Sequence, residues 1–106
     1  MAQNPETKLQ AQVIDALNRR GHLVFNHTVG TFYTSQGTRL KIGNHGEADI
    51  WGVKKGGRAI FLELKMPGKR PRPDQMQFLK VVGDMGAIAG WCTSVEEAIK
   101  LVEETP

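Results

Sequence analysis

The sequence has little cysteine and few aromatic residues, and it contains no long hydrophobic run. Its single cysteine, Cys92, cannot form an internal disulfide, which excludes a secreted scaffold held together by disulfides. No stretch reaches the roughly 18 consecutive apolar residues of a membrane-spanning helix. The first residues also lack the basic region and apolar segment of a signal peptide. We therefore expect a soluble, untargeted protein in a reducing, cytoplasmic setting, with no membrane association.

The chain is also too short for two separate functional units. It has 106 residues, of which 40% are hydrophobic and 7% aromatic. This is enough for one ordinary compact core. We expect a single domain over residues 1–106. Any active site would then share its walls with the surface that binds the substrate.

Charge is distributed unevenly along the chain, although the net charge is only +3. Residues 39–80 contain ten basic and four acidic side chains, whereas residues 81–106 contain one basic and five acidic side chains. A basic segment of this kind favours a surface for polyanions, since Lys and Arg displace the counterions condensed on phosphates. A solvated charged face would give the same pattern, so charge alone does not separate the two interpretations.

Hydrophobic spacing and turn residues predict an element order of αβββαβα. The predicted elements are a helix from Pro5 to just before Gly21, strands over 22–25, 47–53 and 58–65, a helix over 74–85, a strand over 87–91 and a helix after Ser94. The connection over 26–46 is long and rich in glycine. It predicts a functional loop containing an irregular hairpin around residues 35–37.

The strands over 47–53 and 58–65 carry the most informative side chains. A short turn centred on Gly56 places Asp49 directly opposite Glu63. Because side chains alternate along a strand, Glu63 and Lys65 point to the same face. Two carboxylates and an ammonium group therefore converge beside the basic, proline-rich segment over 66–73.

These side chains predict a site for a divalent cation. Carboxylate oxygens suit Mg²⁺ or Mn²⁺, which also accept water and phosphate oxygens as ligands. Such an ion polarises a phosphodiester and lowers the pKa of a bound water, while Lys65 orients that water or offsets developing charge. The alternative is an ordinary ion pair between the strands on a solvated face. The apolar strand from Ala59 to Lys65 favours the metal site, because charges there are costly unless they are used.

Several segments, in this order, resemble the VRR-NUC branch of the PD-(D/E)xK nucleases. They are Glu6 with Leu9-Gln10, Gly46-Glu47-Ala48-Asp49, Phe61-Leu62-Glu63-Leu64-Lys65-Met66-Pro67-Gly68, Asp74-Gln75-Met76-Gln77-Phe78-Leu79, and Gly86-Ala87 to Trp91. The resemblance spans nearly the whole chain. It implies an α/β, restriction-endonuclease-like fold, with an αβββαβ core, a mixed sheet flanked by helices and an additional C-terminal helix.

The resemblance also implies roles for residues in the central strands. Asp49 and Glu63 would be the metal ligands, and the backbone carbonyl of Leu64 would be a third ligand. Lys65 would be the catalytic lysine. The implied cofactor is Mg²⁺ or Mn²⁺, with no small-molecule cofactor.

Two helical residues complete the implied site. Gln75 would be the helix glutamine near the site, and Glu6 would approach the metal through an outer shell or a second ion. The chain departs from the family pattern at two positions. Ala48 stands where proline is expected, and Arg72 stands where a small hydroxyl residue usually caps the helix.

We expect the DNA contacts to come from basic residues in the middle of the chain. They are Lys69, Arg70, Arg72, Lys54, Lys55, Arg39 and Lys41. Standalone proteins of the resembled type are encoded by bacteria or bacteriophages. They resemble Holliday-junction resolvases, which act as homodimers on four-way junctions, and this resemblance implies a metal-dependent, structure-selective DNA endonuclease that acts as a homodimer. The alternatives are a nuclease specific for flaps or mismatches, and a non-catalytic nucleic-acid-binding module.

Overall fold

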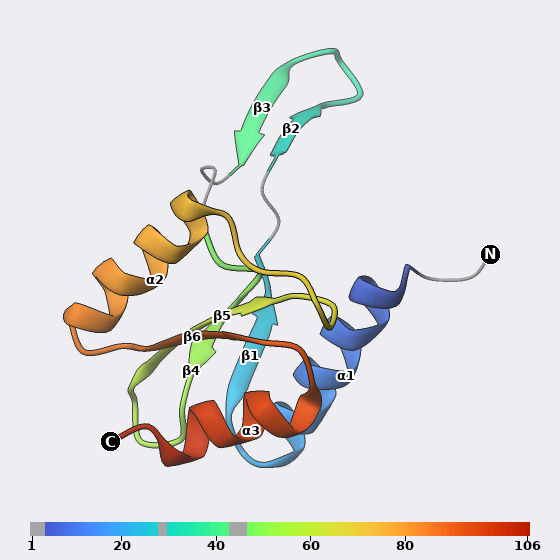
Figure 1. The fold of residues 1–106 in the computed structure, drawn as a ribbon. Helices are drawn as coiled ribbons and strands as arrows, with labels where there is room; N and C mark the ends of the chain where they lie inside the picture. The colour runs from blue at the N-terminus through green and yellow to red at the C-terminus, as the bar shows by residue number, and fades with distance from the viewer. Residues whose placement is uncertain (1–3, 28–29, 43–46) are drawn as a thin grey trace.

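The computed structural model describes residues 4–27, 30–42 and 47–106 (Figure 1). Gly46 of the predicted motif and parts of the connection over 26–46 lie outside the described residues. The elements are α1 (Pro5–Arg19), β1 (Leu23–Asn26), β2 (Gly30–Tyr33), β3 (Arg39–Ile42), β4 (Ile50–Val53), β5 (Ala59–Leu64), α2 (Pro73–Asp84), β6 (Ile88–Cys92) and α3 (Val95–Glu104). The predicted order is confirmed, with the hairpin of β2 and β3 inserted after β1.

The main sheet has the strand order β1-β4-β5-β6. Strand β4 pairs antiparallel with β1 and β5, whereas β6 pairs parallel with β5. A parallel pair needs a long crossover connection, and α2 provides it between β5 and β6. The expected mixed sheet is therefore present.

Helices cover both faces of this sheet (Figure 1). Helices α1 and α3 pack against each other and cover one face, and α2 lies on the other. The buried hydrophobic cluster lies on the α1 and α3 side. Its members are Val13, Leu17, Val24, Ile50, Ile60, Leu62, Leu64, Ile88, Cys92, Ala98 and Val102. Alternation along β5 therefore sends Glu63 to the α2 face.

The helices begin where the capping residues predict. The Asn4 side chain accepts a hydrogen bond of 2.8 Å from the amide of Glu6 at the start of α1. The Ser94 hydroxyl accepts one of 3.1 Å from the amide of Glu97 at the start of α3. Helix α2 begins with Pro73, which suits the first helical position because it has no amide hydrogen to satisfy.

The turn between β4 and β5 sets the register that the sequence predicts. Val53 pairs with Ala59 and Ile50 pairs with Leu62. Gly56 and the next glycine both have a φ of 108°, a conformation that side chains with a Cβ rarely adopt. The same register places Asp49 opposite Glu63 at the end of the ladder.

Strands β2 and β3 form a separate two-stranded sheet that stands out from the body of the molecule (Figure 1). The pairing of Tyr33 with Arg39 closes a turn over residues 34–38, as the expected hairpin requires. None of the helices within the described ranges is long and apolar enough to cross a membrane.

Candidate active site

Glu63 lies at the centre of the candidate site, near the end of β5. Its side chain points to the α2 face and is only 1% exposed. Its Oε1 atom accepts a hydrogen bond of 2.9 Å from Nε2 of Gln75. Its Oε2 atom is buried and has no hydrogen-bond partner within the described part of the chain. A buried carboxylate oxygen without a partner is costly, which makes this atom a candidate ligand for a cation.

Asp49 precedes β4 and faces the same end of β5. Its Oδ2 atom accepts a hydrogen bond of 3.1 Å from the amide of Leu64. The β4–β5 pairing ends at Ile50 and Leu62, and beyond it the Asp49 side chain accepts the hydrogen bond that a backbone carbonyl would otherwise accept. In an extended strand, the amide and carbonyl of one residue point to the same edge. The Leu64 carbonyl is therefore directed to the side on which Asp49 lies.

The pKa of Glu63 reflects the crowding of charge in this site. Burial, as the largest cause, and the adjacent carboxyl of Asp49 together raise it to about 8. Lys65 opposes the rise, and its Nζ lies 3.8 Å from Oε1 of Glu63. One ammonium group at this distance compensates the buried carboxylate only in part. The pair of carboxylates therefore favours an additional positive charge.

Gln75 holds Glu63 from the first turn of α2. The backbone amide of Arg72 donates a hydrogen bond of 2.8 Å to Oε1 of Gln75. Because Oε1 is an acceptor there, the amide group of Gln75 faces Glu63 as a donor. Arg72 occupies the capping position of α2, as the sequence indicates, and the Gln75 side chain satisfies its backbone amide.

Glu6 lies in the first turn of α1. Its negative charge contributes to the raised pKa of Glu63, although less than burial and Asp49 do. The structure thus brings Glu6 within electrostatic range of the two carboxylates. Its predicted role toward a metal stays a prediction.

A further pair of side chains beside the site has no signal in the linear sequence. Nε2 of His27 lies 2.6 Å from Oε2 of Glu47, and the His27 ring stacks on Trp51 with centroids 3.9 Å apart. The His27 amide also donates a hydrogen bond of 2.7 Å to the carbonyl of Asp49. His27 and Glu47 meet because β1 and β4 are paired, which the local pattern of either segment does not reveal.

Comparison with solved structures identifies the fold. A structure described as a "VRR_NUC domain" superposes with a TM-score of 0.69 and 20% sequence identity, over 95% of this chain and 97% of that chain. The chain has the VRR-NUC domain fold. Neither a protein-family model nor a curated protein matches the sequence. The fold that the resemblance implied is therefore confirmed, through a structural likeness at low sequence identity.

The donor atoms in this VRR-NUC fold fit a divalent cation. Among the described residues, no group of three or more His, Cys, Asp and Glu side chains is placed to hold a metal. Asp49 and Glu63 nevertheless offer two carboxylates, and the Leu64 carbonyl is directed to the same edge. Two carboxylates and a carbonyl leave positions for water and phosphate, as Mg²⁺ and Mn²⁺ prefer. The unpartnered Oε2 of Glu63 supports this fit.

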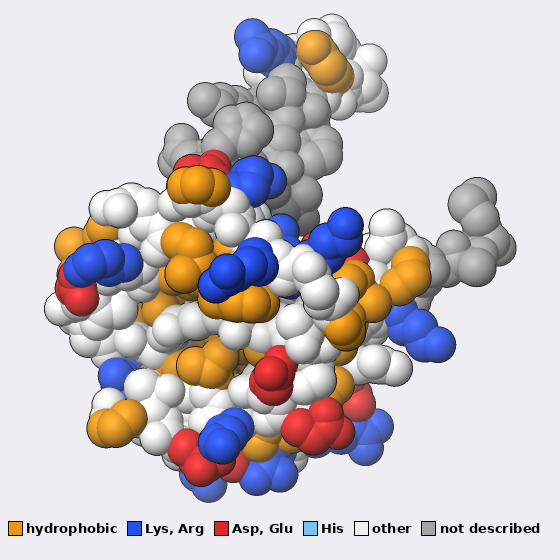
Figure 2. Space-filling model, in the orientation of Figure 1, with side chains coloured by type: hydrophobic (Ala, Val, Ile, Leu, Met, Phe, Trp, Pro, Cys, Tyr) orange, Lys and Arg blue, Asp and Glu red, His pale blue; other side chains and the backbone are white. Residues whose placement is uncertain are grey.

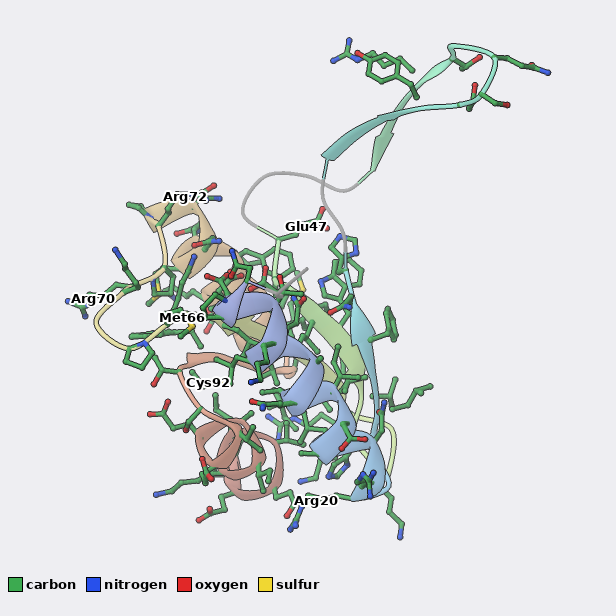
Figure 3. All side chains as sticks on the ribbon, turned by 90° about the vertical axis from the view of Figure 1, so that its right-hand side faces the viewer. Arg20, Glu47, Met66, Arg70, Arg72 and Cys92 are labelled. Atoms are coloured by element: carbon green, nitrogen blue, oxygen red, sulfur yellow. The ribbon has the colours of Figure 1, made fainter. Side chains whose placement is uncertain are left out.

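The VRR-NUC fold divides the predicted DNA-binding residues between different places. Lys69, Arg70 and Arg72 lie on the loop between β5 and α2, and Arg70 and Arg72 point outward at the same end of the molecule as Glu47 (Figure 3). Lys69 and Arg70 form no side-chain ion pair within the described ranges, whereas Arg72 pairs with Asp74 at 3.2 Å. This loop is therefore the basic segment nearest to the carboxylates.

Three of the other predicted contacts lie away from the site. Lys54 and Lys55 are in the turn between β4 and β5, at the opposite end of these strands, so that Lys54 is about five residues or roughly 17 Å from Asp49 along the strand. Arg39 is exposed at the start of β3, and the side chain of Lys41 lies outside the described part of the chain. Figure 2 shows Lys and Arg side chains over the loop between β5 and α2, and Asp and Glu side chains gathered over α3.

Proposed function

We propose that the protein is a metal-dependent, structure-selective DNA endonuclease that hydrolyses phosphodiester bonds. The observation that carries this proposal is the buried, unpartnered Oε2 of Glu63 beside Asp49. A purely structural carboxylate at this depth would have its oxygens hydrogen-bonded. The VRR-NUC fold supports the reaction class.

Asp49, Glu63 and the Leu64 carbonyl would hold Mg²⁺ or Mn²⁺. When bound, such an ion polarises the phosphodiester and lowers the pKa of a coordinated water. Asp49 also fixes the end of β5 through its hydrogen bond to the Leu64 amide, which keeps the carbonyl of that residue directed to the site. The ligands therefore hold one another in place before the substrate arrives.

Lys65 acts on the water and the phosphate, and Gln75 positions Glu63. The Lys65 ammonium lies at the edge of the carboxylate pair, where it orients the attacking water or offsets the charge that develops on the phosphate. Gln75 fixes the orientation of Glu63 through Oε1, which leaves Oε2 available to the ion. Glu6 acts from further away, through an outer shell or a second ion.

The substrate class that we propose is branched DNA, with the four-way junction first. The basic loop over 66–72 lies beside the carboxylates and suits the phosphates of DNA. One chain supplies one such site, and symmetric cleavage of two strands needs two sites. A homodimer related by a two-fold axis would supply them.

The test is a cleavage assay on a panel of labelled DNAs in Mg²⁺ and in Mn²⁺. The panel contains a four-way junction, a flap, a splayed duplex, a mismatch and a plain duplex. We expect symmetric cuts in the junction and little cutting of the plain duplex. A preference for the flap or the mismatch would replace the junction as substrate while leaving the endonuclease proposal intact.

Substitutions at the carboxylates separate catalysis from binding. Asp49→Ala and Glu63→Gln should abolish metal-dependent cleavage and leave junction binding largely intact. Wild-type cutting by either variant would refute the site. Binding without cleavage by the wild-type protein, in either metal, would indicate the alternative of a non-catalytic nucleic-acid-binding module.

A further inference from the structure

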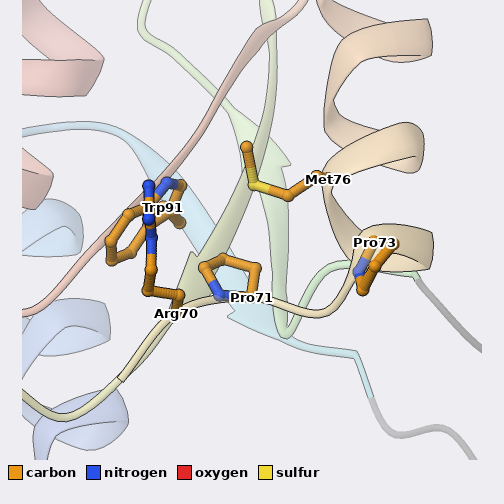
Figure 4. A pocket seen from close by; sticks show the side chains of 5 residues that line it. All are labelled: Arg70, Pro71, Pro73, Met76 and Trp91. Carbon is orange, nitrogen blue, oxygen red and sulfur yellow. The ribbon is translucent and has the colours of Figure 1, made fainter. Parts of the chain in front are cut away.

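A pocket of about 280 Å³ lies between β6 and the loop that leads into α2 (Figure 4). Its walls are mainly apolar. The lining residues are Arg70, Pro71, Pro73, Met76 and Trp91. The volume is close to the lower end of pockets that hold small organic molecules, about 300 Å³. The pocket is thus large enough for one planar ring system.

The register of the sheet places this pocket beside the carboxylate pair. Trp91 is the residue of β6 that pairs with Glu63 in the parallel ladder. Neighbouring strands lie about 4.8 Å apart, and paired side chains point to the same face. Met76, on the opposite wall, directly follows Gln75, which binds Glu63. A group held in the pocket would therefore lie next to any phosphate bound at the carboxylates.

The lining combines an aromatic plane with an unpaired cation. The Trp91 indole offers a flat, partly exposed surface. The Arg70 side chain lines the pocket beside Trp91 and forms no hydrogen bond or ion pair with the rest of the described chain (Figure 4). A flat apolar ring joined to an anion matches both features. Nucleotides have this chemistry, and stacking on an aromatic side chain tolerates any base.

We propose that the pocket holds one unpaired nucleobase of the DNA substrate, stacked on Trp91, while Arg70 contacts the adjacent phosphate. This inference rests on the proposed function, because it takes DNA as the substrate. A paired base lies inside the duplex and must first be extruded, whereas an unpaired base enters at little cost. The pocket therefore favours DNA with unpaired bases, such as flaps and splayed ends, over plain duplex, and in a fully paired four-way junction it requires that one base be extruded at the branch point.

Two features favour a nucleobase over an apolar side chain of a protein partner. Arg70 stands in a run of cations with Lys69 and Arg72, which suits a polyanion. The wall is also rigid, since Pro71 and Pro73 have fixed φ angles. A rigid wall loses little conformational freedom when a ring binds.

The first test removes single bases from the substrate. An abasic residue is placed in turn at each nucleotide flanking the cut, in whichever DNA of the panel the wild-type protein cleaves best. At one position we expect the cleavage rate to fall on the order of tenfold to a hundredfold. Trp91→Leu should cleave the abasic and intact substrates equally, because leucine fills space without offering a stacking plane. Trp91→Phe should keep most of the discrimination.

A matched variant separates the effect of losing a pocket residue from the general effect of losing one positive charge. Arg19 is exposed near the end of α1 and pairs with Asp15. Arg19→Ala removes the same charge as Arg70→Ala. Only Arg70→Ala should reduce the difference in cleavage rate between the intact and the abasic substrate. If no abasic position affects the wild-type protein, or if Trp91→Leu discriminates normally, the inference is wrong. A changed oligomeric state in Trp91→Leu, with discrimination intact, would assign the pocket to a second copy of the chain.

A binding measurement keeps this inference separate from the proposed function. The chain has two tryptophans, so Trp51→Phe leaves Trp91 as the only one. In Ca²⁺, branched DNA should quench the fluorescence of Trp91, and the same DNA with the critical base removed should not. Quenching without any cleavage in Mg²⁺ or in Mn²⁺ would support the pocket and refute the endonuclease. DNA binding without quenching would refute the pocket alone.

Discussion

The two faces of the central sheet differ in the chemistry of the side chains that they bury and in whether the buried polar atoms have hydrogen-bond partners. The face under α1 and α3 is hydrophobic, and Ile60, Leu62 and Leu64 of strand β5 are fully buried on it. The face under α2 buries Glu63 from the same strand, and leaves one of its oxygens without a hydrogen-bond partner among the described residues.

This difference indicates which face stabilises the fold and which carries the proposed site. Burial of large aliphatic side chains is the main source of stability in a small domain. A buried carboxylate costs stability unless it is paired. Glu63 is tolerated because its raised pKa keeps it largely protonated, because Gln75 and Lys65 lie beside it, and because the opposite face supplies the stability. Four predictions test this division.

The largest expected effect is on cleavage, when the charge of Asp49 is removed without changing its shape. The asparagine of Asp49→Asn can still accept the hydrogen bond from the Leu64 amide, so the end of β5 should be retained. We expect the cleavage rate in Mg²⁺ to fall by more than about a hundredfold, since loss of an outer-shell partner alone costs 10- to 100-fold.

The control for Asp49→Asn is Asp15→Asn, an equivalent change on the exposed surface of α1. It should cut at the wild-type rate. Rates measured under single-turnover conditions, with circular dichroism to confirm folding, separate the two variants. Equal rates for both would remove Asp49 from the site.

The next effect is on stability, and it is confined to the hydrophobic face. Leu62→Ala creates a cavity in the buried cluster and should lower the free energy of unfolding by about 2–5 kcal/mol. Val81→Ala on α2, where the side chain is 41% exposed, should cost much less. Urea unfolding of both variants measures the difference. Similar losses would contradict the division between the faces.

The sequence predicts the local parts of this arrangement well. The turn at Gly56 sets the register of Asp49 and Glu63, and alternation then assigns each side chain to a face. Asn4 and Ser94 cap their helices through contacts that span two or three residues. Such features depend only on residues that are close together in the sequence, so they can be predicted from the sequence.

The rest depends on contacts between distant segments. His27 and Glu47 meet only through the pairing of β1 with β4. Trp91 comes beside Glu63 only because α2 carries the chain across to a parallel strand. The length and composition of an apolar strand do not determine which strand it pairs with. The sequence alone therefore gives the carboxylates but not the pocket beside them.

A smaller effect on stability has the opposite sign, and it arises at Glu63. The folded chain keeps this carboxyl protonated up to a pKa of about 8, whereas the unfolded chain ionises it near 4.5. Stability of the metal-free protein therefore falls as pH rises from 4.5 to 8. Glu63→Gln removes this loss and should be more stable than wild type by about 1–3 kcal/mol at pH 7.

Thermal unfolding across pH 4.5 to 8 tests the effect at Glu63. The advantage of Glu63→Gln should grow with pH, while Glu96→Gln on the exposed side of α3 should track the wild type. Added Mg²⁺ should raise the unfolding temperature of wild type and not that of Glu63→Gln, because the proposed site predicts that only the wild type binds the ion. An unchanged or lower stability of Glu63→Gln at pH 8 would contradict the cost assigned to the buried carboxylate.

The smallest effect comes from Glu103, a carboxylate whose pKa shifts in the opposite direction to that of Glu63. It lies on α3, 2.5 Å from the guanidinium of Arg20 and 3.1 Å from Nε2 of His22, and these partners lower its pKa to about 2. The lowered pKa means that its stabilisation is complete above pH 4.5 and is lost as pH falls toward 2. Glu103→Gln should therefore unfold at a slightly lower temperature than wild type at pH 6, with the gap closing by pH 2. A gap that stays constant with pH would mean that packing, and not charge, accounts for the contribution of Glu103.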